Sequence, residues 1–274
     1  MEDAFDRETV DRYLRLLGVE REPLTLAVLN RLTSAYLERV PFETISKLWR
    51  RKRFGLVNIP AIGDYLDGIE RYHFGGTCYA NNYYFFRLLA ALGYDVRLCG
   101  ADMSTHNAHM VSMVRVEGRE YLVDVGYGAP FWQPIPRDLP HDWRVRFGRE
   151  EYVLKPQDAA GASRMEEYRD GQYMHGYLAL PAAQTLADFS GVIAHSFRPA
   201  ATFMQALMLA RFRPKGSVLV WNLTINKARE DASVKTRTVI RSELPCEIES
   251  LFGIPAEIAA EAIAELPEPM GVLP

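Results

Sequence analysis

Apolar residues recur at every third or fourth position through the first third of the chain, which is the spacing of one buried helical face. Asp6 and Gly18 stand at the two ends of a first periodic segment, in the positions expected of helix caps. A second helix is expected to begin near Thr25, just after Pro23. The apolar faces of these helices are formed by Phe5, Val10, Tyr13, Leu14 and Leu17 in the first and by Leu26, Leu29, Tyr36 and Leu37 in the second, with Leu32 at its edge.

Two further segments lie before residue 78. The run of basic residues at 49–53 is expected to be the solvated end of a helix, because a run of like charges is usually exposed. Residues 56–70 are interpreted as an apolar link that Pro60 and Gly63 interrupt. We therefore expect the first 95 residues to be helical apart from this link.

A helix is also expected to begin at or near Cys78, because its apolar residues follow the helical spacing and a glycine ends the pattern. These residues are Phe85, Leu88, Leu89 and Leu92, followed by Gly93. The N-terminus of a helix favours an anion such as a thiolate. Gly75 and Gly76 allow close approach of the backbone or a positive φ just before the cysteine. Cys78 is thus a candidate nucleophile, and the alternative is a buried structural thiol.

From residue 94 the apolar pattern changes to that of short strands separated by glycine and asparagine turns. Residues 96 to about 195 are therefore predicted to form a small antiparallel sheet or barrel. The predicted strands are 94–98, 109–116, 120–125, 144–154 and 168–180, with a loop at 158–163. The remaining segments are predicted as a helix at 203–211, strands at 217–225 and 236–240, and helices at 245–251 and 255–266.

Composition narrows the class of protein. The chain has 274 residues, of which 48% are hydrophobic, so it can bury a sizeable core. A formal net charge of −3 with scattered basic residues argues against a nucleic-acid binder. The acidic N-terminus lacks the apolar segment of a signal peptide, and no apolar run approaches the roughly 18 residues of a membrane span. We expect a soluble, intracellular protein with small-molecule or protein partners.

The spacing of the cysteines and histidines gives little support for a disulfide framework or a metal site. The three cysteines, Cys78, Cys99 and Cys246, are far apart, so neither a disulfide framework nor a cysteine zinc site is indicated, and we expect no metal. Of the histidines, His141, His175 and His195 have no carboxylate at a useful spacing in the sequence.

His109 and Asp124 are the informative pair. If Glu117 and Gly118 form a two-residue turn, Val116 pairs with Arg119, and His109 then lies diagonally across from Asp124 on the same face. Diagonal neighbours of this kind are about 7 to 8 Å apart at the backbone, close enough for a carboxylate to bind an imidazole nitrogen. A three-residue turn would place the two side chains on opposite faces.

Neither member of the pair is decisive by itself. His109 alone would be interpreted as a satisfied core histidine, and the competing His106 as a loop histidine. A carboxylate in an otherwise apolar strand is harder to explain without function, because burying it without a partner costs several kcal/mol. Cys78, His109 and Asp124 therefore form a candidate nucleophile, base and orienting carboxylate.

Three segments resemble the arylamine N-acetyltransferases in order and spacing: Gly-Gly-Thr-Cys-Tyr at 75–79, Ala-His-Met at 108–110, and Val-Asp-Val-Gly-Tyr-Gly at 123–128. The likeness extends to Pro-Phe-Glu at 41–43, His195-Ser196, Phe203 and residues 212–222. It implies an α+β fold with a helical domain at 1–95, an antiparallel β-barrel domain at 96–200 and an α/β lid at 201–274. It also implies that Cys78 accepts the acyl group, His109 is the base and Asp124 orients the histidine, as in papain-type proteases and transglutaminases.

The resemblance further implies a cytoplasmic acetyltransferase, a monomer or homodimer, that uses acetyl-CoA as cosubstrate and acetylates an arylamine or hydrazine by a ping-pong mechanism. The implied coenzyme contacts are Gly126, Tyr127, Gly128 and Phe203, and the implied acceptor contacts are Phe42, Tyr127 and Phe131. The simpler interpretation of the aromatic residues is plain core, and that of the glycines is a turn at the end of a strand.

This chain departs from the family at two positions. Phe74 and Ala80 stand where the family usually has an arginine and a glutamate. Glu43, which pairs with that arginine in the family, is expected to find another partner here, such as Arg71 or His73. The alternatives to an arylamine N-acetyltransferase are an amide synthase that uses a larger acyl thioester, a hydrolase, and a non-catalytic homologue that only binds coenzyme A.

Overall fold

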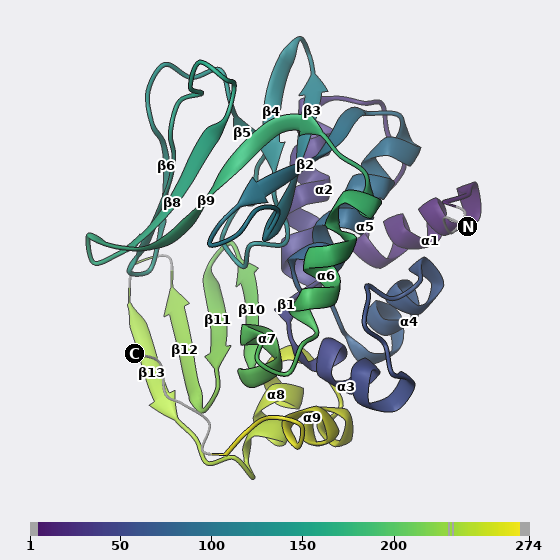
Figure 1. Cartoon of the computed structure of the whole chain (residues 1–274), viewed down its shortest axis with the longest axis vertical. Coiled ribbons are helices and arrows are strands. Elements are labelled where there is room, and N and C mark those ends of the chain that lie inside the picture. Colours follow the sequence, from purple (N-terminus) through teal and green to yellow (C-terminus); the bar gives the residue numbers. More distant parts are fainter. Residues whose placement is uncertain (1–4, 230, 232, 269–274) are drawn as a thin grey trace.

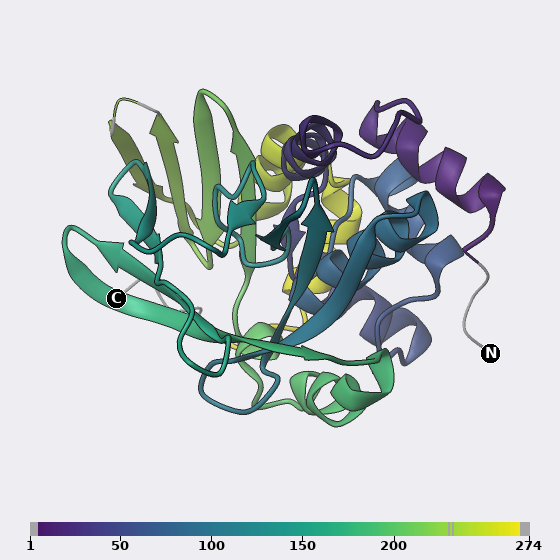
Figure 2. The same cartoon turned by 90° about the horizontal axis from the view of Figure 1, so that it is seen from above.

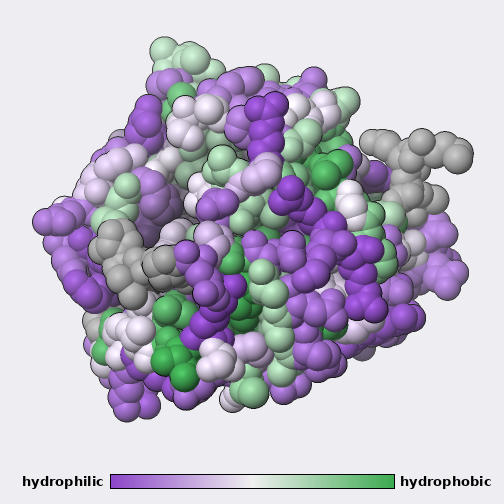
Figure 3. All heavy atoms as spheres, turned by 60° about the horizontal axis from the view of Figure 1, so that its bottom comes forward, coloured by the Kyte–Doolittle hydropathy of each residue, from purple (hydrophilic) through white to green (hydrophobic). Residues whose placement is uncertain are grey.

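The computed structural model describes residues 5–229, 231 and 233–268. Helices occupy one side of the molecule, and two antiparallel sheets lie beside them (Figures 1 and 2). The predicted α+β fold is confirmed. Within the described residues, no helix is long and apolar enough to cross a bilayer. Figure 3 shows a face that is mainly hydrophilic, with hydrophobic residues in small separate patches.

The N-terminal part of the chain is helical, as predicted. Asp6 caps the first helix by accepting a hydrogen bond from the backbone N–H of Thr9, and Gly18 ends it in the left-handed conformation. In the second helix Val28 is buried, whereas the predicted core residue Leu26 is only half-buried. The described helices of this part are α1 (Arg7–Leu17), α2 (Leu26–Arg39), α3 (Ile45–Phe54), α4 (Ile62–Tyr72) and α5 (Cys78–Leu92).

Two predictions for this part were wrong. Helix α4 takes up most of the link predicted at 56–70 and extends past it to Tyr72, and its buried residues Ile62, Tyr65, Leu66 and Ile69 follow the helical spacing. Pro60 and Gly63 lie before it and at its start, where they do not disturb the helix. The basic run at 49–53 is not wholly solvated, because Arg50 is buried and donates a hydrogen bond to the backbone carbonyl of Asp64.

The middle part of the chain forms an eight-stranded antiparallel sheet that curls into a nearly closed barrel (Figure 1). Val116 pairs with Arg119, so the register predicted from a two-residue turn is confirmed. Helix α5 packs against β2 and β3. The strands, in the spatial order β5-β4-β3-β2-β9-β8-β7-β6, are β2 (Asp95–Asp102), β3 (His109–Val116), β4 (Arg119–Val123), β5 (Ile135–Pro136), β6 (Trp143–Phe147), β7 (Glu150–Leu154), β8 (Ser163–Arg169) and β9 (Gln172–Ala183).

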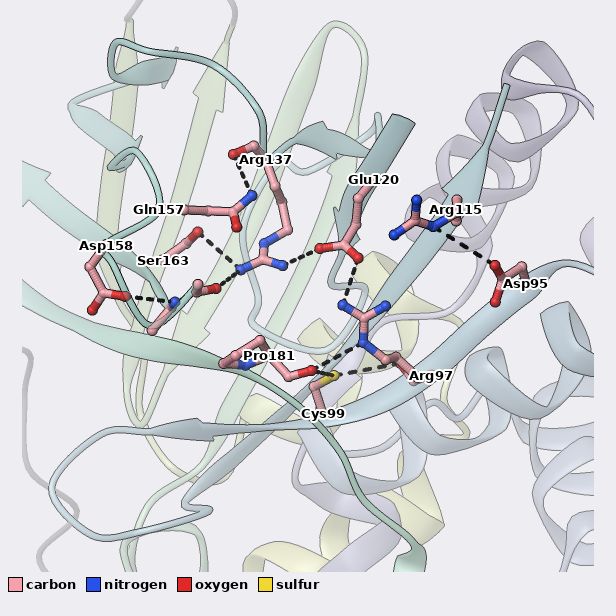
Figure 4. A network of polar contacts seen from close by, with 12 residues as sticks. Asp95, Arg97, Cys99, Arg115, Glu120, Arg137, Gln157, Asp158, Ser163 and Pro181 are labelled. Atoms are coloured by element: carbon pink, nitrogen blue, oxygen red, sulfur yellow. Dashed lines mark hydrogen bonds and ion pairs between the residues drawn. The ribbon is translucent and has the colours of Figure 1, made fainter. Parts of the chain in front are cut away.

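A network of polar contacts ties this sheet together (Figure 4). Glu120 on β4 accepts a hydrogen bond of 2.6 Å from Arg97 on β2 and a second one from the buried Arg137 after β5. Arg137 also donates to the carbonyl of Gly161 and, at 3.3 Å, to the hydroxyl of Ser163. Strands β5 and β8 are not neighbours in the sheet. The side chain of Arg137 therefore connects two regions that no backbone hydrogen bonds between these strands join.

The C-terminal part contributes a five-stranded sheet with the order β1-β10-β11-β12-β13. Its first strand, β1 (Phe42–Glu43), comes from the N-terminal part of the chain. The other elements are η1 (Leu186–Phe189), α6 (Ser190–Ser196), α7 (Thr202–Gln205), β10 (Met208–Arg213), β11 (Gly216–Trp221), β12 (Thr224–Arg229), β13 (Val234–Thr238), α8 (Leu244–Phe252) and α9 (Ala256–Ile263). The two closing helices agree with the prediction.

Two predictions for this part were wrong. The helix predicted at 203–211 is limited to α7, and strand β10 follows it, because pairing with β1 and β11 on both sides outweighs the local helical spacing. The strand predicted at 217–225 is a hairpin of β11 and β12. Asn222 has a φ of 49° at the turn, a left-handed conformation that asparagine tolerates better than most residues.

Candidate active site

Cys78 is the first residue of α5, as predicted, with Thr77 at the N-cap position. The loop before it passes very close to the segment that precedes β1. A Cβ atom on Gly75 would lie 1.8 Å from the carbonyl oxygen of Pro41, so only glycine fits there. Phe42 forms a bridge with Gly76, and the N–H of Glu43 donates to the carbonyl of Gly76 at 3.0 Å. The position of the cysteine is thus fixed by backbone contacts.

His109 and Asp124 meet in the interior. His109 is the first residue of β3, and Asp124 follows the last residue of β4. The Nε2 atom of His109 lies 2.8 Å from Oδ2 of Asp124, and the two side chains are 2% and 0% exposed. The predicted contact between these residues is therefore present.

The pKa values of the pair are shifted in opposite directions. Burial alone would lower the pKa of His109, but the charge and hydrogen bond of Asp124, together with the neighbouring Cys78, raise it well above its usual value. Burial alone would raise the pKa of Asp124, but the charge of His109 and hydrogen bonds from His109 and Asn82 hold it below its usual value. The contact therefore favours the imidazolium over the neutral histidine and the carboxylate over the carboxylic acid.

Asn82 supports the carboxylate, and the sequence analysis missed it. Its Nδ2 donates to Oδ1 of Asp124 at 2.8 Å and to the carbonyl of Met110 at 2.6 Å, and its Oδ1 accepts the N–H of Val125 at 2.9 Å. Asn82 lies four residues after Cys78 on the same helix, so both face the barrel. The sequence did contain a signal for this role, because Asn82 is a polar residue on the face of the helix that was expected to be buried.

The predicted binding residues lie in two aromatic groups. The Tyr127 ring lies 5.6 Å from that of His109 and stacks on Phe131 at 5.9 Å. The Phe42 and Phe203 rings are 5.4 Å apart, and Gly128, with a φ of 80°, faces Phe42. The structure therefore brings the predicted aromatic residues close to the histidine and to the start of the five-stranded sheet. Their binding roles remain predictions.

Gly126 is packed tightly against the nucleophile helix. A Cβ atom there would lie 2.7 Å from Nδ2 of Asn82 and 2.9 Å from Cα of Cys78. We expect Gly126→Ala to displace Cys78 from His109 and to lower kcat/KM for the reaction of this site on the order of 100-fold, since small misplacements of reacting groups have effects of this size. Steady-state kinetics would measure it. Gly63→Ala is the matched control, because open space surrounds Gly63, and wild-type rates in both variants would contradict the expectation.

The comparisons with known proteins agree with this geometry. A family model described as N-acetyltransferase matches residues 25–261. The chain belongs to the arylamine N-acetyltransferase family. Arylamine N-acetyltransferase 1 of Homo sapiens is 22% identical over 280 residues, which cover 89% of this chain and 93% of the human protein.

Two other relatives extend the comparison. Proansamycin X synthase of Amycolatopsis mediterranei is 32% identical, but the match covers 47% of this chain and 50% of the synthase. The crystal structure of arylamine N-acetyltransferase from Nocardia farcinica has a TM-score of 0.77 and 24% identity over 93% of each chain. This likeness shows that the two proteins share a fold.

The hydrogen-bond partners of Glu43 in the acetyltransferase differ from those expected from the sequence, which were Arg71 or His73. Glu43 is fully buried and accepts hydrogen bonds from the N–H groups of Ser46 and Gly75, at 2.8 and 3.2 Å. Burial raises its pKa, and the charge of Arg50 opposes that shift. The Arg50 guanidinium lies over the Phe74 ring, 5.9 Å from its centroid. A cation from α3 is therefore close to the position where the family usually has its arginine.

Two further histidines of the acetyltransferase, His106 and His175, lie close to carboxylates. His106 lies in the exposed loop as predicted, 2.9 Å from Asp102. The expectation that His175 has no carboxylate nearby was wrong, because it pairs across β8 and β9 with Glu167, at 3.2 Å. Its other ring nitrogen lies 2.6 Å from the hydroxyl of Tyr127. Glu167 and His175 are eight residues apart in the sequence, and they become cross-strand neighbours because a tight turn joins β8 to β9.

Proposed function

We propose that the enzyme transfers an acetyl group from acetyl-CoA to Cys78, as a thioester, and then to the nitrogen of an arylamine or arylhydrazine. The observation that carries this proposal is the buried, hydrogen-bonded pair of His109 and Asp124 beside a cysteine at a helix N-terminus. A thiol needs a base in order to become a nucleophile, and a base needs a carboxylate that holds it in one tautomer. The three residues supply these groups.

The first step activates the thiol. Because Nε2 of His109 is bound to Asp124, Nδ1 is the nitrogen that takes the proton from Cys78. The resulting imidazolium is stabilised by Asp124. The thiolate is stabilised by the imidazolium and by the positive end of the α5 dipole. This ion pair is the form of the site that attacks the thioester.

Acyl transfer then follows in two halves. The Cys78 thiolate attacks the thioester carbonyl, and the tetrahedral intermediate collapses with loss of the coenzyme thiolate, which takes the proton from His109. The N–H of Cys78 is the favoured oxyanion donor, because the N–H groups of Val125 and Gly126 are bound to Asn82 and Asp124. In the second half the amine attacks the acetyl-enzyme, His109 accepts its proton, and the cysteine is released.

The aromatic groups suit an arylamine acceptor. Arylamines are weak bases and are largely neutral at pH 7, so an apolar pocket can bind them in the nucleophilic form. We assign Phe42, Tyr127 and Phe131 to the acceptor. We assign Gly126, Tyr127, Gly128 and Phe203 to the coenzyme. The stacked pair of Tyr127 and Phe131 close to His109 supports the acceptor assignment.

Intact-mass spectrometry tests this function directly. After brief incubation with acetyl-CoA, the protein should gain the mass of one acetyl group, and addition of an arylamine should remove it with formation of the acetylated amine. The covalent intermediate also requires ping-pong kinetics, with parallel double-reciprocal plots. Acetylation of the amine without an acetyl-enzyme at any time would contradict the proposal.

The alternative is an amide synthase that uses a larger acyl thioester with the same three residues. The observation that favours it is the 32% identity to proansamycin X synthase over half of that protein. A panel of acyl thioesters of increasing size separates the two functions by the mass of the acyl-enzyme. Exclusive loading of the acetyl group would leave arylamine N-acetylation as the activity.

A further inference from the structure

Strand β9 places two side chains beside the candidate active site that the proposed mechanism does not use. His175 and Tyr177 are two residues apart, so they lie on the same face of the strand. The Tyr177 ring lies 5.0 Å from that of His109 and 5.1 Å from that of Tyr127. A Cβ atom on Gly176, between them, would lie 2.1 Å from a backbone carbonyl oxygen of β8, so the two strands are very close here. This face of β9 therefore borders the candidate base.

His175 connects two polar groups. Its Nδ1 lies 2.6 Å from the hydroxyl oxygen of Tyr127, and its Nε2 lies 3.2 Å from Oε2 of Glu167, the opposite residue on β8. Glu167 is only 7% exposed, and among the described residues His175 is the one basic side chain within ion-pair distance of it. The Tyr127 hydroxyl is therefore joined to a buried carboxylate through a single imidazole ring.

The surrounding charges decide which nitrogen of His175 carries the proton. Burial and the charge of Glu150 raise the pKa of Glu167 to about 7, against the charge of Arg169, so the carboxylate is mostly ionised at pH 8. Burial and the charges of Arg169 and His109 lower the pKa of His175, so its ring is neutral at that pH. An ionised carboxylate can only accept a hydrogen bond, which places the proton of the ring on Nε2. Nδ1 is then the acceptor of the phenol O–H.

The Tyr127 ring is the part of this chain of contacts that lies next to the reacting groups. Its centroid is 5.6 Å from that of His109, and it stacks on Phe131 with an angle of 5° between the ring planes. Contacts between rings tolerate several arrangements, whereas a hydrogen bond to the phenol oxygen fixes one end of the ring. Because Tyr127 is only half-buried, loss of this bond would leave the ring free to tilt. The bond to His175 therefore determines how firmly the ring is held beside His109.

We propose that His175 is a positioning residue for acetyl transfer, and that together with Glu167 it holds the Tyr127 ring between His109 and Phe131. The inference rests on the proposed function, in which Tyr127 contacts the acceptor and the coenzyme. Neither His175 nor Glu167 reacts with a substrate, since both act through the hydroxyl of Tyr127. The proposal adds strands β8 and β9 to the elements that shape the site, which were α5, β3 and β4.

Nuclear magnetic resonance of ¹⁵N-labelled histidines tests the placement of the ring without any turnover. At pH 8 His175 should carry its proton on Nε2, and Tyr127→Phe should change the Nδ1 signal because the hydrogen bond is lost. The ring protons of His109 lie within the ring current of Tyr127, so His175→Leu should shift their signals. His175→Asn should leave them close to their wild-type positions, because the asparagine oxygen can accept the phenol O–H.

The two substitutions at His175 form a matched pair. Asparagine and leucine have nearly the same shape, and only asparagine keeps an acceptor near the position of Nδ1. We expect both variants to fold, since the side chain of His175 is 52% exposed, and thermal unfolding would verify it.

Steady-state kinetics test whether this placement matters for the reaction. His175→Leu should lower kcat/KM for an arylamine about three- to tenfold, the effect of losing one hydrogen bond, and His175→Asn should retain most of the wild-type value. Tyr127→Phe should have an effect of similar size. The double variant Tyr127→Phe/His175→Leu should be no slower than the slower single variant, because both changes break the same bond. His106→Leu is the control, since His106 also lies beside a carboxylate, 2.9 Å from Asp102, but in an exposed loop.

The outcomes separate this inference from the proposed function. Wild-type His109 signals or wild-type kcat/KM in His175→Leu would overturn the inference, and so would effects of the two single variants that multiply in the double variant. If the wild-type protein forms the acetyl-enzyme while His175→Leu is fully active, the inference fails alone. If the wild-type protein forms no acetyl-enzyme, the proposed function fails. In that case a shift of the His109 signals in His175→Leu, but not in His175→Asn, would still support the placement of the ring by His175, and its absence would overturn it.

Discussion

Replacing Cys78 by serine should abolish both the acetyl-enzyme and the transfer of acetyl groups to arylamines. A serine hydroxyl at this position is not ionised by the imidazole, and removal of a nucleophile that acts with its base typically costs at least about 10⁴-fold in rate. The fold should be retained, because the two side chains are similar in size and Cys78 makes its contribution through chemistry. Intact mass and steady-state kinetics with acetyl-CoA are the measurements.

The chain offers its own controls for this substitution. Cys246 is an exposed free thiol and Cys99 is buried on β2, where burial raises the pKa of its thiol to about 11. Cys246→Ser should therefore react like the wild-type protein with acetyl-CoA, and the single acetyl group should map to the peptide that contains Cys78. Full activity in Cys78→Ser would remove the basis of the proposed mechanism.

Asp124→Asn should lower kcat on the order of 10³- to 10⁴-fold while leaving the fold intact. The asparagine Oδ1 can still accept from Asn82 and from the N–H of Gly126, but its amide group cannot accept the N–H of His109. The raised pKa of His109 depends on the Asp124 charge, so in the variant the imidazolium should lose its proton at a lower pH.

Alkylation by iodoacetamide reports this change without acetyl-CoA. In the wild-type protein rapid alkylation of Cys78 should persist well below pH 8, because the imidazolium remains protonated beside the sulfur. In Asp124→Asn the rate at pH 6 should fall to that of an ordinary thiol. Asp102→Asn is the matched control, since Asp102 binds the exposed His106 at 2.9 Å. A variant at Asp102 that is as impaired as the one at Asp124 would contradict the assignment of the base.

The sequence predicted the contacts of the candidate site more completely than the elements around it. The contact of His109 with Asp124 depends on one local quantity, the length of the turn at Glu117 and Gly118, which sets the register of the hairpin. The start of α5 at Cys78 depends on another local pattern. Both are determined by a short stretch of residues, so periodicity and turn chemistry were sufficient to predict them.

The errors have a different origin. Strand β10 has the spacing of a helix, and its pairing with β1 joins residues that lie far apart in the sequence. The burial of Arg50 and Lys47 likewise depends on how α3 packs against distant segments, which a local charge run does not reveal. Asn82 was overlooked because its role appears only when α5 is placed against the barrel. Tertiary partners, which one sequence does not display, decided each of these cases.

The two-residue strand β1 has a further consequence for how this enzyme can be altered. Phe42 pairs with Ala210 on one side and bridges Gly76 on the other, so the C-terminal sheet is joined by backbone contacts to the cysteine loop. A chimaera that exchanges the C-terminal third between two relatives must therefore preserve a match with residues 41–43 of the recipient, or the nucleophile itself will shift. For the same reason the C-terminal sheet is unsuited to swing away as a hinged flap during turnover, because such a motion would break the backbone contacts of β1 with β10 or with Gly76.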